Sequence, residues 1–419
     1  MCGILGSINV FFEKSTLDLI THRGPDNWGL EEYRGAGNST ILFGHRRLSI
    51  VDLSPAGHQP MTSQCGKYHI VFNGEIYNHL ELRRELKDVN FKGHSDTETI
   101  INFIARFGIS SVSKFNGIFS LAVYDEVKNK VYLIRDRFGV KPLYYSSTEK
   151  GIAFCSEIKP LIKLLPQKMD VANLSTLLRL RYNPSPTTLF SNIHKLRPGH
   201  LLEFDLEKSV SKITSFLQVN PINHHISYQD ALKQYAEKVE SAIKRQLMAD
   251  VDLGILLSGG IDSALVTYFA QKYYSKKLKT FTVGFNENDE ANEVIEAKQT
   301  SEIIGTDHFE VLITANQFDD VLRKLINMVE EPLGTTSIIP MYYLNQLVAK
   351  HVKVVLTGQG ADEPLGGYTR YQGELYRNYI PTIVFDVLKK LKIQSKNQTI
   401  DRVKQQRRYL FSTNHSTID

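Results

Sequence analysis

The sequence predicts an α+β unit followed by an α/β unit built around a parallel sheet. The first half contains short segments rich in β-branched and aromatic residues, broken by turn residues, and only a few helical segments. After residue 226 the pattern changes to strands that alternate with helices, which is typical of a parallel sheet covered on both faces. The 419 residues suit two globular domains, and the hydrophobic (42%) and charged (23%) shares are those of a soluble protein.

Five segments of the first half are expected to be strands, and two are expected to be helices. One helix covers residues 78–86. The other follows a Ser95 cap, with Glu98 as its capping-box partner, and stops at Gly108. The expected strands are residues 3–12, 39–52, 67–77, 119–126 and 130–136. Prolines punctuate the segment from 183 to 225, so we expect the first domain to comprise residues 2–210 and a connector to follow it.

The second domain is expected to comprise residues 227–419. It opens with a helix capped by Ser227. The apolar residues of this helix recur close to helical spacing. The expected strands are residues 253–257, 279–285, 308–313 and 352–358, and the expected helices are residues 264–274, 292–305, 316–329 and 341–350. This alternation predicts helices on both faces of the sheet.

Charge and cysteine content argue against several classes of protein. The net charge is +5, with acidic and basic residues interspersed over most of the chain, so nucleic-acid binding is not expected. Cys2, Cys65 and Cys155 are too few for a disulfide framework and suit a reducing cytosol. No basic region precedes the first apolar stretch, and no apolar run is long enough to span a bilayer. We therefore expect a cytoplasmic protein with no membrane partner, in which Cys65 and Cys155 are buried small residues.

Cys2 is a candidate nucleophile because it follows Met1 directly. Removal of Met1 would leave a cysteine with a free α-amine, whose ordinary pKa is about 8. That amine is able to take the thiol proton, so the nucleophile would carry its own base. Position 2 alone is weak support, since an early small apolar residue is the simpler explanation.

Four spaced motifs strengthen this hypothesis. They are HRGPDNWG at 22–29, GHRRLSIVDLSPAGHQPM at 44–61, FNGEIYNH at 72–79 and SDTET at 95–99. Together with MCGI they resemble the glutaminase domain of class II glutamine amidotransferases. The resemblance covers about the first 200 residues. It implies an N-terminal-nucleophile hydrolase domain, an αββα sandwich, with glutamine as a substrate.

The resemblance implies a role for each residue of the glutaminase site. Cys2 would attack glutamine, and Asn73 and Gly74 would donate hydrogen bonds to the oxyanion. Arg47 suits the α-carboxylate, with a surface salt bridge as its alternative. Glu75 and Asp96 suit the ammonium. The remaining glutamine-binding residues are expected to be Leu48, Ser49, Ile50 and Val51. Two further alternatives stay open: a plain hairpin turn at Asn73-Gly74, and an Asp96 that only favours the positive end of its own helix.

A second motif follows the strand at 253–257. The string Ser258-Gly259-Gly260-Ile261-Asp262-Ser263 precedes a helix, so its glycines, hydroxyls and helix N-terminus suit a phosphate. It lacks the lysine of P-loop proteins. A glycine pair after a strand is often only a tight turn. The full string, however, resembles the pyrophosphate loop of ATP pyrophosphatases, a Rossmann-like α/β domain that splits ATP into AMP and pyrophosphate.

The nucleotide site is expected to hold Mg²⁺. A carboxylate such as Asp262 repels a phosphate unless a cation lies between them. Asp362, in GQGADEPLGGYTRY at 358–371, is the second expected ligand. The positions that match the adenosine pocket of asparagine synthetases are Leu257, Val283, Thr357 and Gly358. For Leu257 and Val283 ordinary strand core is the alternative.

The order of the two motifs is similar to that of the asparagine synthetase family, over about residues 2–375. The resemblance implies an ATP-dependent, AMP-forming ligase that uses glutamine, ATP and a carboxylate acceptor, with aspartate as the default. A homodimer is one assembly it allows. Two alternatives stay open: amidation of another carboxylate, such as an acidic sugar in surface-polysaccharide synthesis, and a glutaminase or regulatory nucleotide-binding protein with a degenerate synthetase domain.

The sequence departs from the family pattern in two places. Many members have an acidic residue at the position of Gln359, which has no titratable group and is unable to act as a base. Relatives also continue beyond residue 419 and carry there a lysine that helps to neutralise the transition state. We therefore expect either a minimal synthetase domain or a truncated chain, and slow synthesis with aspartate.

Overall fold

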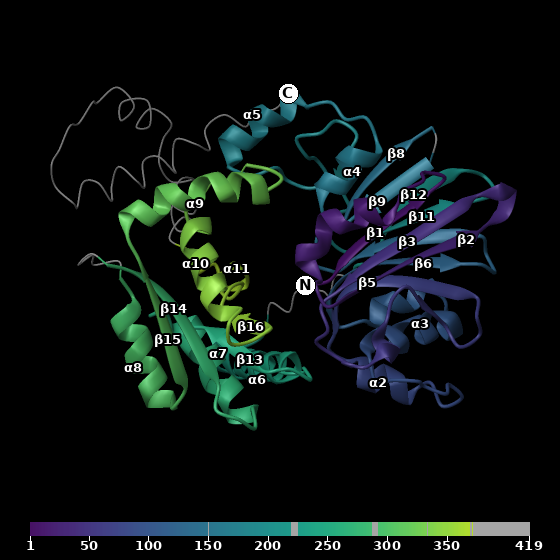
Figure 1. The fold of residues 1–419 in the computed structure, drawn as a ribbon. Helices are drawn as coiled ribbons and strands as arrows, with labels where there is room; N and C mark the ends of the chain where they lie inside the picture. Colours follow the sequence, from purple (N-terminus) through teal and green to yellow (C-terminus); the bar gives the residue numbers. More distant parts are fainter. Residues whose placement is uncertain (150, 219–224, 287–291, 333, 369–370, 372–419) are drawn as a thin grey trace.

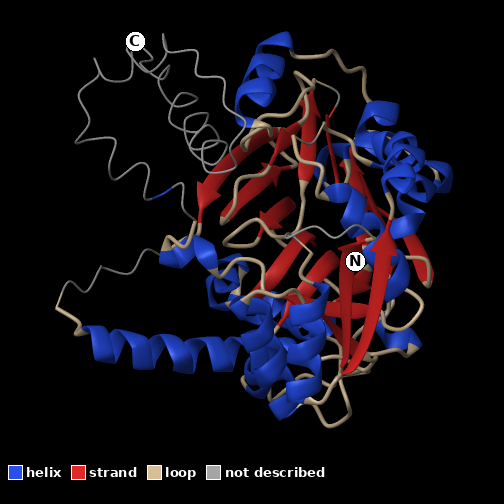
Figure 2. Ribbon diagram, turned by 90° about the vertical axis from the view of Figure 1, so that its left-hand side faces the viewer, coloured by secondary structure: helices blue, strands red, loops and turns tan. Residues whose placement is uncertain are grey.

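The computed structural model describes residues 1–149, 151–218, 225–286, 292–332, 334–368 and 371. They form two units, one in each half of the chain (Figure 1). In Figure 2 the strands lie in the interior of the molecule, and most helices lie around them. Residues 372–419 of the predicted second domain lie outside the described residues.

The first unit contains two six-stranded sheets with antiparallel neighbours. Their orders are β10-β8-β9-β1-β3-β2 and β12-β11-β7-β6-β5-β4. The strands of the first sheet are β10 (His194–Lys195), β8 (Tyr144–Thr148), β9 (Gly151–Cys155), β1 (Gly3–Ile8), β3 (Thr40–Arg47) and β2 (Asn27–Arg34). Those of the second are β12 (Val210–Ser215), β11 (His200–Asp205), β7 (Lys130–Arg135), β6 (Gly117–Asp125), β5 (Tyr68–Ile76) and β4 (Met61–Thr62).

Helices cover the outer faces of both sheets. They are α1 (Lys14–Leu17), α2 (His79–Arg84), α3 (Asp96–Phe107) and α4 (Ile158–Leu164). The first unit also contains α5 (Val171–Leu180) and short 3₁₀ turns at Asp18–Arg23, Ala36–Asn38, Pro55–Gly57 and Ile109–Lys114. Three apolar layers hold the unit together. Phe43 and Leu133 belong to the layer between the sheets, Phe103 to the layer under α2 and α3, and Leu161 to the layer under α4. This is the expected αββα sandwich.

The helix predicted after Ser95 is confirmed as α3. The Ser95 hydroxyl accepts the Glu98 N–H at 3.2 Å, and the helix ends at Gly108, whose φ of 78° favours glycine. The capping box is only half formed, however. The Glu98 carboxylate accepts the N–H groups of Lys92 and Gly93 at 2.7 and 3.0 Å instead of the Ser95 N–H.

The proline-rich segment forms the end of the first unit. Its strand β12 pairs with β11 along its full length, from Val210 to Ser215. A boundary at residue 210 would cut this strand from its sheet. We therefore propose that the first domain continues to Ser215 and that the second begins at Ser227, whose hydroxyl caps α6.

The second unit is a four-stranded parallel sheet in the order β15-β14-β13-β16. Its strands are β13 (Leu253–Leu256), β14 (Lys279–Phe285), β15 (Asp307–Ile313) and β16 (Val354–Thr357). Its helices are α6 (Tyr228–Gln246), α7 (Ile261–Tyr273), α8 (Val294–Ile304), α9 (Ala315–Met328), α10 (Ile338–Val348) and α11 (Asp362–Leu365). Ile243 of α6 and Ala270 of α7 pack with Ile255 on one face, and Leu344 of α10 packs with Phe281 on the other. Helices on both faces are therefore confirmed.

Candidate active sites

Cys2 lies at the end of strand β1, beside the end of its neighbour β3. Gly3 pairs with Arg46, so the chain that leaves β3 passes the thiol. The Cys2 Sγ accepts the Leu48 N–H at 3.4 Å and lies 3.6 Å from the Leu48 carbonyl oxygen, to which it donates. Burial raises the pKa of the Cys2 thiol, although the Leu48 hydrogen bond acts in the opposite direction. The thiol therefore needs a base to become a nucleophile.

An N-terminal amine is available as that base. In the chain that still carries Met1, burial lowers the pKa of the N-terminal ammonium to about 6, so this amine is largely neutral at pH 7. Removal of Met1 would move the amine onto Cys2 itself. A cysteine activated by its own α-amine would need such a neutral amine.

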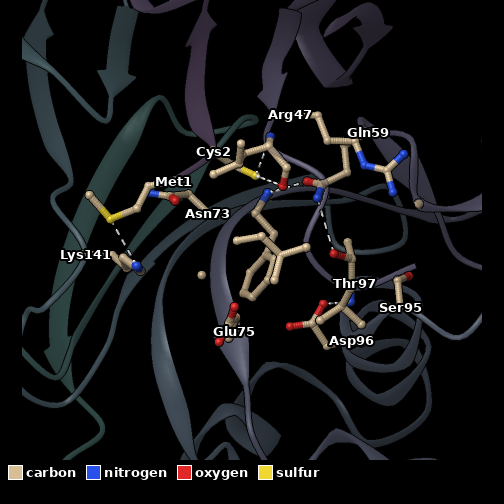
Figure 3. A pocket seen from close by; sticks show the side chains of 16 residues that line it. Met1, Cys2, Arg47, Gln59, Asn73, Glu75, Ser95, Asp96, Thr97 and Lys141 are labelled. Carbon is tan, nitrogen blue, oxygen red and sulfur yellow. Dashed lines mark hydrogen bonds between the residues drawn. The ribbon is translucent and has the colours of Figure 1, made fainter. Parts of the chain in front are cut away.

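A single pocket surrounds the thiol (Figure 3). The predicted residues that line it are Cys2, Arg47, Leu48, Ile50, Val51, Asn73, Gly74, Glu75 and Asp96. They come from the residue before β1, from the end of β3 and the loop that follows it, from β5 and from the first turn of α3. Ser49 is the exception among the predicted residues: it does not line the pocket, and its N–H donates to the Asp26 carboxylate at 2.8 Å.

Asn73 and Gly74 lie within strand β5, where they pair with Ser120 and Phe119 of β6, and not in a hairpin turn. The Asn73 side chain is 1% exposed, and neither its nitrogen nor its oxygen has a hydrogen-bond partner among the described residues. A buried amide without a hydrogen-bond partner costs free energy of folding, so the unpartnered Asn73 amide indicates that a ligand binds there. A side chain at position 74 would clash, because its Cβ would lie 2.2 Å from the Ile118 carbonyl oxygen.

Arg47 is buried and forms no salt bridge within the described ranges, so the surface-pair alternative does not hold there. Its Nη1 donates to the Ser54 carbonyl at 3.0 Å, and its Nη2 donates to the Asp52 carbonyl. The guanidinium therefore shapes the loop after β3 while it lines the pocket. It brings a positive charge to the pocket, and this charge would attract a carboxylate of a ligand.

The carboxylates of Glu75 and Asp96 line the same pocket, and Figure 3 shows them on a different side of it from Arg47. Asp96 accepts the N–H groups of Ile76 and Thr97 at 2.9 and 2.8 Å, yet burial raises the pKa of Asp96 to about 6. Burial, followed by the nearby Asp96, raises the pKa of Glu75 to about 7. An ammonium between them would favour both charged forms. The guanidinium on one side of the thiol and the two carboxylates on the other fit the carboxylate and the ammonium of an α-amino acid.

The raised pKa of Glu75 predicts a pH dependence of glutamine hydrolysis. Because the pKa is raised, Glu75 loses its charge below about pH 7 instead of near 4.5, and the glutamine ammonium then loses a partner. We expect kcat/KM for glutamine to fall about tenfold between pH 8 and pH 6, with Asp96 steepening the loss near pH 6. Initial rates of glutamate release across this range provide the measurement.

The matched control is Glu75→Gln, which keeps the shape of the side chain and removes its titration. This variant should start at a lower kcat/KM and lose less of it between pH 8 and pH 7. A wild-type profile that stays flat down to pH 6 would contradict the assignment.

The structure adds lining residues that the sequence did not indicate. Gln59 accepts the Phe72 N–H at 2.7 Å and donates to Thr97 Oγ1 at 3.2 Å, which ties the loop after β3 to β5 and α3. Lys141 is 9% exposed and reaches the pocket from the loop after β7, with its Nζ 3.1 Å from Met1 Sδ. No local spacing brings residue 141 to residue 2; only the pairing of distant strands does. The prediction for the other cysteines is half wrong, since Cys155 is buried but Cys65 is exposed.

A second pocket lies at the carboxyl ends of β13, β14 and β16. The predicted residues that line it are Leu257, Ser258, Gly260, Asp262, Ser263, Val283, Thr357, Gly358, Gln359 and Asp362. Leu257 and Val283 therefore face the pocket as well as the strand core. Gly259 does not line it. Its N–H donates to the Glu293 carboxylate at 3.0 Å, so this loop N–H already has a partner within the protein.

The loop from Ser258 to Ser263 is held by its own hydroxyls. The two serine oxygens lie 2.9 Å apart, and Ser263 Oγ accepts the Ser258 N–H at 3.1 Å. The loop at Thr357–Gly360 packs against the first turn of α7, where a Cβ at position 358 would lie 2.8 Å from the Ser263 nitrogen. Only glycine permits this contact between the two loops.

Asp262 and Asp362 face this pocket from the first turns of α7 and α11. Mg²⁺ usually takes one or two protein carboxylates and completes its shell with phosphate oxygens and water. The described ranges contain no group of three or more His, Cys, Asp or Glu side chains that could hold a metal ion alone. The residues present therefore fit an ion that arrives with a nucleotide.

Gln359 also lines the nucleotide pocket, and it brings no titratable group to that position. Its N–H donates to Thr357 Oγ1 at 3.2 Å. The lining residues that were not predicted are Leu256, Phe281, Thr282, Glu293, Met341, Leu344, Gly360 and Tyr368.

Among the described helices none is both long and apolar enough to cross a membrane.

Two family models match the chain. The model described as a glutamine amidotransferase domain matches residues 1–216, and the model described as asparagine synthase matches residues 234–416. The structure is also similar to that of a glutamine phosphoribosylpyrophosphate amidotransferase from Bacillus subtilis, with a TM-score of 0.39 and 15% identity over 90% of this chain and 77% of that one. This likeness is too weak to bear on function.

Several relatives are about a third identical to the chain over the aligned residues. Asparagine synthetase [glutamine-hydrolyzing] 1 of Bacillus subtilis is 33% identical over 90% of this chain and 60% of its own length. A protein of Methanocaldococcus jannaschii, provisionally named as a second glutamine-hydrolysing asparagine synthetase, is 31% identical over 88% of this chain and 76% of its own. Amidase chry2 of Gibberella zeae is 30% identical over 86% of this chain and 56% of its own.

The chain spans about 60% of the length of the first relatives it matches. The glutamine amidotransferase model nonetheless covers more than half of the chain, and the Methanocaldococcus protein is covered over three quarters of its length. From this coverage, and from the order of its two sites, the chain belongs to the glutamine-hydrolysing asparagine synthetase family.

Proposed function

We propose that this chain is an ATP-dependent amidotransferase, which hydrolyses glutamine at Cys2 and transfers the ammonia to a carboxylate activated at the second pocket. The observation that carries the proposal is the convergence of a thiol, an unpartnered Asn73 amide, Arg47 and two carboxylates on one pocket. This set matches every functional group of glutamine. A second pocket, lined by residues of the 258–263 loop to which we assign phosphate binding, supports the other half of the reaction.

In the first half-reaction, the Cys2 thiolate adds to the side-chain carboxamide carbon of glutamine after the α-amine has taken the thiol proton. The Asn73 amide and the Gly74 N–H would stabilise the oxyanion. Ammonia leaves with that proton, and water then hydrolyses the thioester to glutamate. Arg47, Glu75 and Asp96 would hold the substrate through its α-carboxylate and ammonium.

In the second half-reaction, the acceptor carboxylate attacks the α-phosphate of ATP and releases pyrophosphate. Ammonia then displaces AMP from the acyl-adenylate. The Gly260 backbone and the hydroxyls of Ser258 and Ser263 suit the departing pyrophosphate. Asp262 and Asp362 would hold Mg²⁺, which would offset the phosphate charge. Leu257, Val283, Thr357 and Gly358 are the proposed contacts of the adenosine.

Aspartate is the acceptor that family membership favours. The relative named as an amidase indicates that naming within this group is not uniform, so an acidic sugar or another carboxylate stays as the second candidate. The presence of Gln359 in the nucleotide pocket favours this second candidate, or a glutaminase with a degenerate synthetase half, because the expected acidic group is absent. A cytoplasmic location, favoured by three unpaired cysteines, is part of the same proposal.

A screen of acceptors tests the proposal. The chain is incubated with glutamine, ATP, Mg²⁺ and aspartate or other carboxylates, and glutamate, AMP and pyrophosphate are measured together. The true acceptor should give AMP and pyrophosphate in equal amounts. Asp262→Asn should lower this nucleotide turnover about 100-fold or more, since it removes a proposed ligand of the Mg²⁺ that offsets the phosphate charge, while glutamate release is largely unchanged.

Each outcome separates the candidates. Glutamate release without AMP for every carboxylate would select the glutaminase with a degenerate synthetase half. Loss of both activities in a folded Asp262→Asn protein would show that the two sites are not independent. Absence of glutamate release in the unmodified chain would refute the proposal as a whole.

A further inference from the structure

The loop after β3, residues 47–54, forms one wall of the Cys2 pocket, and the second unit holds its outer side. Two residues of the second unit hold it, Asp250 directly and Lys353 through Asp26, and each lies within three residues of the start of a strand of the parallel sheet. Asp250 comes before β13, and Lys353 comes before β16. These two strands are parallel neighbours, so their amino ends lie together at one edge of the sheet.

Asp250 contacts the loop through its backbone and its side chain. Its N–H donates to the Ile50 carbonyl at 2.9 Å, and its carboxylate accepts the Asp52 N–H at 2.7 Å. The same carboxylate oxygen lies 2.7 Å from His94 Nε2, and the His94 N–H donates to the buried Asp52 carboxylate at 2.9 Å. The loop is therefore bonded at two positions, Ile50 and Asp52, to a residue of the other unit.

Lys353 reaches the beginning of the same loop through Asp26. Its Nζ lies 2.8 Å from the Asp26 carboxylate oxygen that accepts the Ser49 N–H at 2.8 Å. The Asp26 N–H in turn donates to the Arg47 carbonyl at 3.0 Å. This chain of contacts also explains why Ser49 is turned away from the pocket.

The inner side of the loop carries the glutamine-binding groups. Leu48 contacts the Cys2 thiol, and Ile50 and Val51 line the pocket. Arg47 bonds to the carbonyls of Asp52 and Ser54, so its guanidinium moves with the loop. Outer contacts that fix the loop therefore also fix the groups that would meet the substrate.

We propose that Asp250 and Lys353 are positioning residues of the glutamine site, which hold the loop of residues 47–54 in its binding conformation from the other domain. This inference rests on the proposed glutaminase function. It assigns a role in glutamine binding to two residues that lie outside the glutaminase half of the chain. Neither residue lines the pocket, so both act through the loop.

Variants of the full chain test the proposal. Asp250→Ala should raise KM for glutamine about tenfold or more, since it removes the acceptor of the Asp52 N–H and of His94. Lys353→Met should raise it about two- to fivefold, the scale of a partly exposed ion pair. In both variants kcat should fall by less than KM rises, because Cys2 and Asn73 are unchanged.

Conservative variants give the readout that a purely structural role would not produce. Asp250→Asn keeps an acceptor for the Asp52 N–H, and Lys353→Arg keeps the charge opposite Asp26, so both should restore most of the glutamine affinity. Lys353→Met and Asp26→Asn should be non-additive when combined, because they break the same contact.

The matched control is Lys195→Met. Lys195 forms a 2.6 Å ion pair with Glu331 across the same two units but does not touch the loop. This variant should leave KM for glutamine unchanged. An equal rise of KM in Lys195→Met would show general loosening of the interface and would overturn the proposal, as would unchanged KM in Asp250→Ala. A wild-type chain without glutaminase activity would instead refute the proposed function.

Discussion

Replacement of Cys2 by alanine is expected to abolish glutamine hydrolysis, with a loss of about 10⁴-fold or more on the scale of a removed nucleophile. No other thiol of the described residues is able to substitute. Cys65 is exposed and Cys155 is buried in β9, and neither lines the pocket. Ammonia-dependent amidation should persist, because free ammonia bypasses the first site. Glutamate release is measured with glutamine, and AMP release is measured with ammonium chloride as the nitrogen source.

Two comparisons make this result specific. Cys65→Ala is the matched control and should retain wild-type glutamate release. The intact mass of the active protein should correspond to a chain that begins at Cys2, since the α-amine is the proposed base. Retained hydrolysis in Cys2→Ala would end the nucleophile assignment, and full activity in a chain that keeps Met1 would end the assignment of the base.

Local patterns predicted the four strands of the second unit and five of the twelve described strands of the first, namely β1, β3, β5, β6 and β7. Ser95 and Gly108 mark the two ends of α3 because capping and positive φ depend only on adjacent residues. The parallel sheet after Ser227 was predicted from the alternation of strands and helices, which is also visible in the local pattern of the sequence. The strand β2 at Asn27–Arg34 was not predicted, because its polar side chains lack a clear period. Its place is set by pairing with β3, which is a tertiary contact.

The sites show the same division. The motif strings predicted that Cys2, Arg47 and Asn73 lie close together, and all three line one pocket. Ser49 and Gly259 were placed in the sites but have protein partners, Asp26 and Glu293, that lie far away in the sequence. Lys141 and Asp250 had no local signal at all. Residues that act across units become visible only once the units are packed.

Gln359→Glu is expected to increase pyrophosphate release with aspartate by about 100-fold or more, because a general base commonly contributes 10²- to 10⁴-fold. Gln359 lines the nucleotide pocket next to Thr357 and Gly358, and its amide is unable to accept a proton. A glutamate there would place a carboxylate where many family members have one. The measurement is pyrophosphate release with aspartate, ATP, Mg²⁺ and ammonia, which removes the glutaminase half from the rate.

Gln346→Glu is the matched control for this gain. Gln346 lies on α10 outside the pocket, and its amide donates to the Tyr342 hydroxyl at 2.9 Å, so the new charge should not affect turnover. Rapid turnover of aspartate by the unmodified chain would show that a neutral amide at position 359 is sufficient. If Gln359→Glu stays as slow as the parent, the missing base does not limit the reaction with aspartate. The same assay with other carboxylates would then separate a different acceptor, which should release pyrophosphate in the unmodified chain, from a nucleotide pocket that binds ATP without turnover.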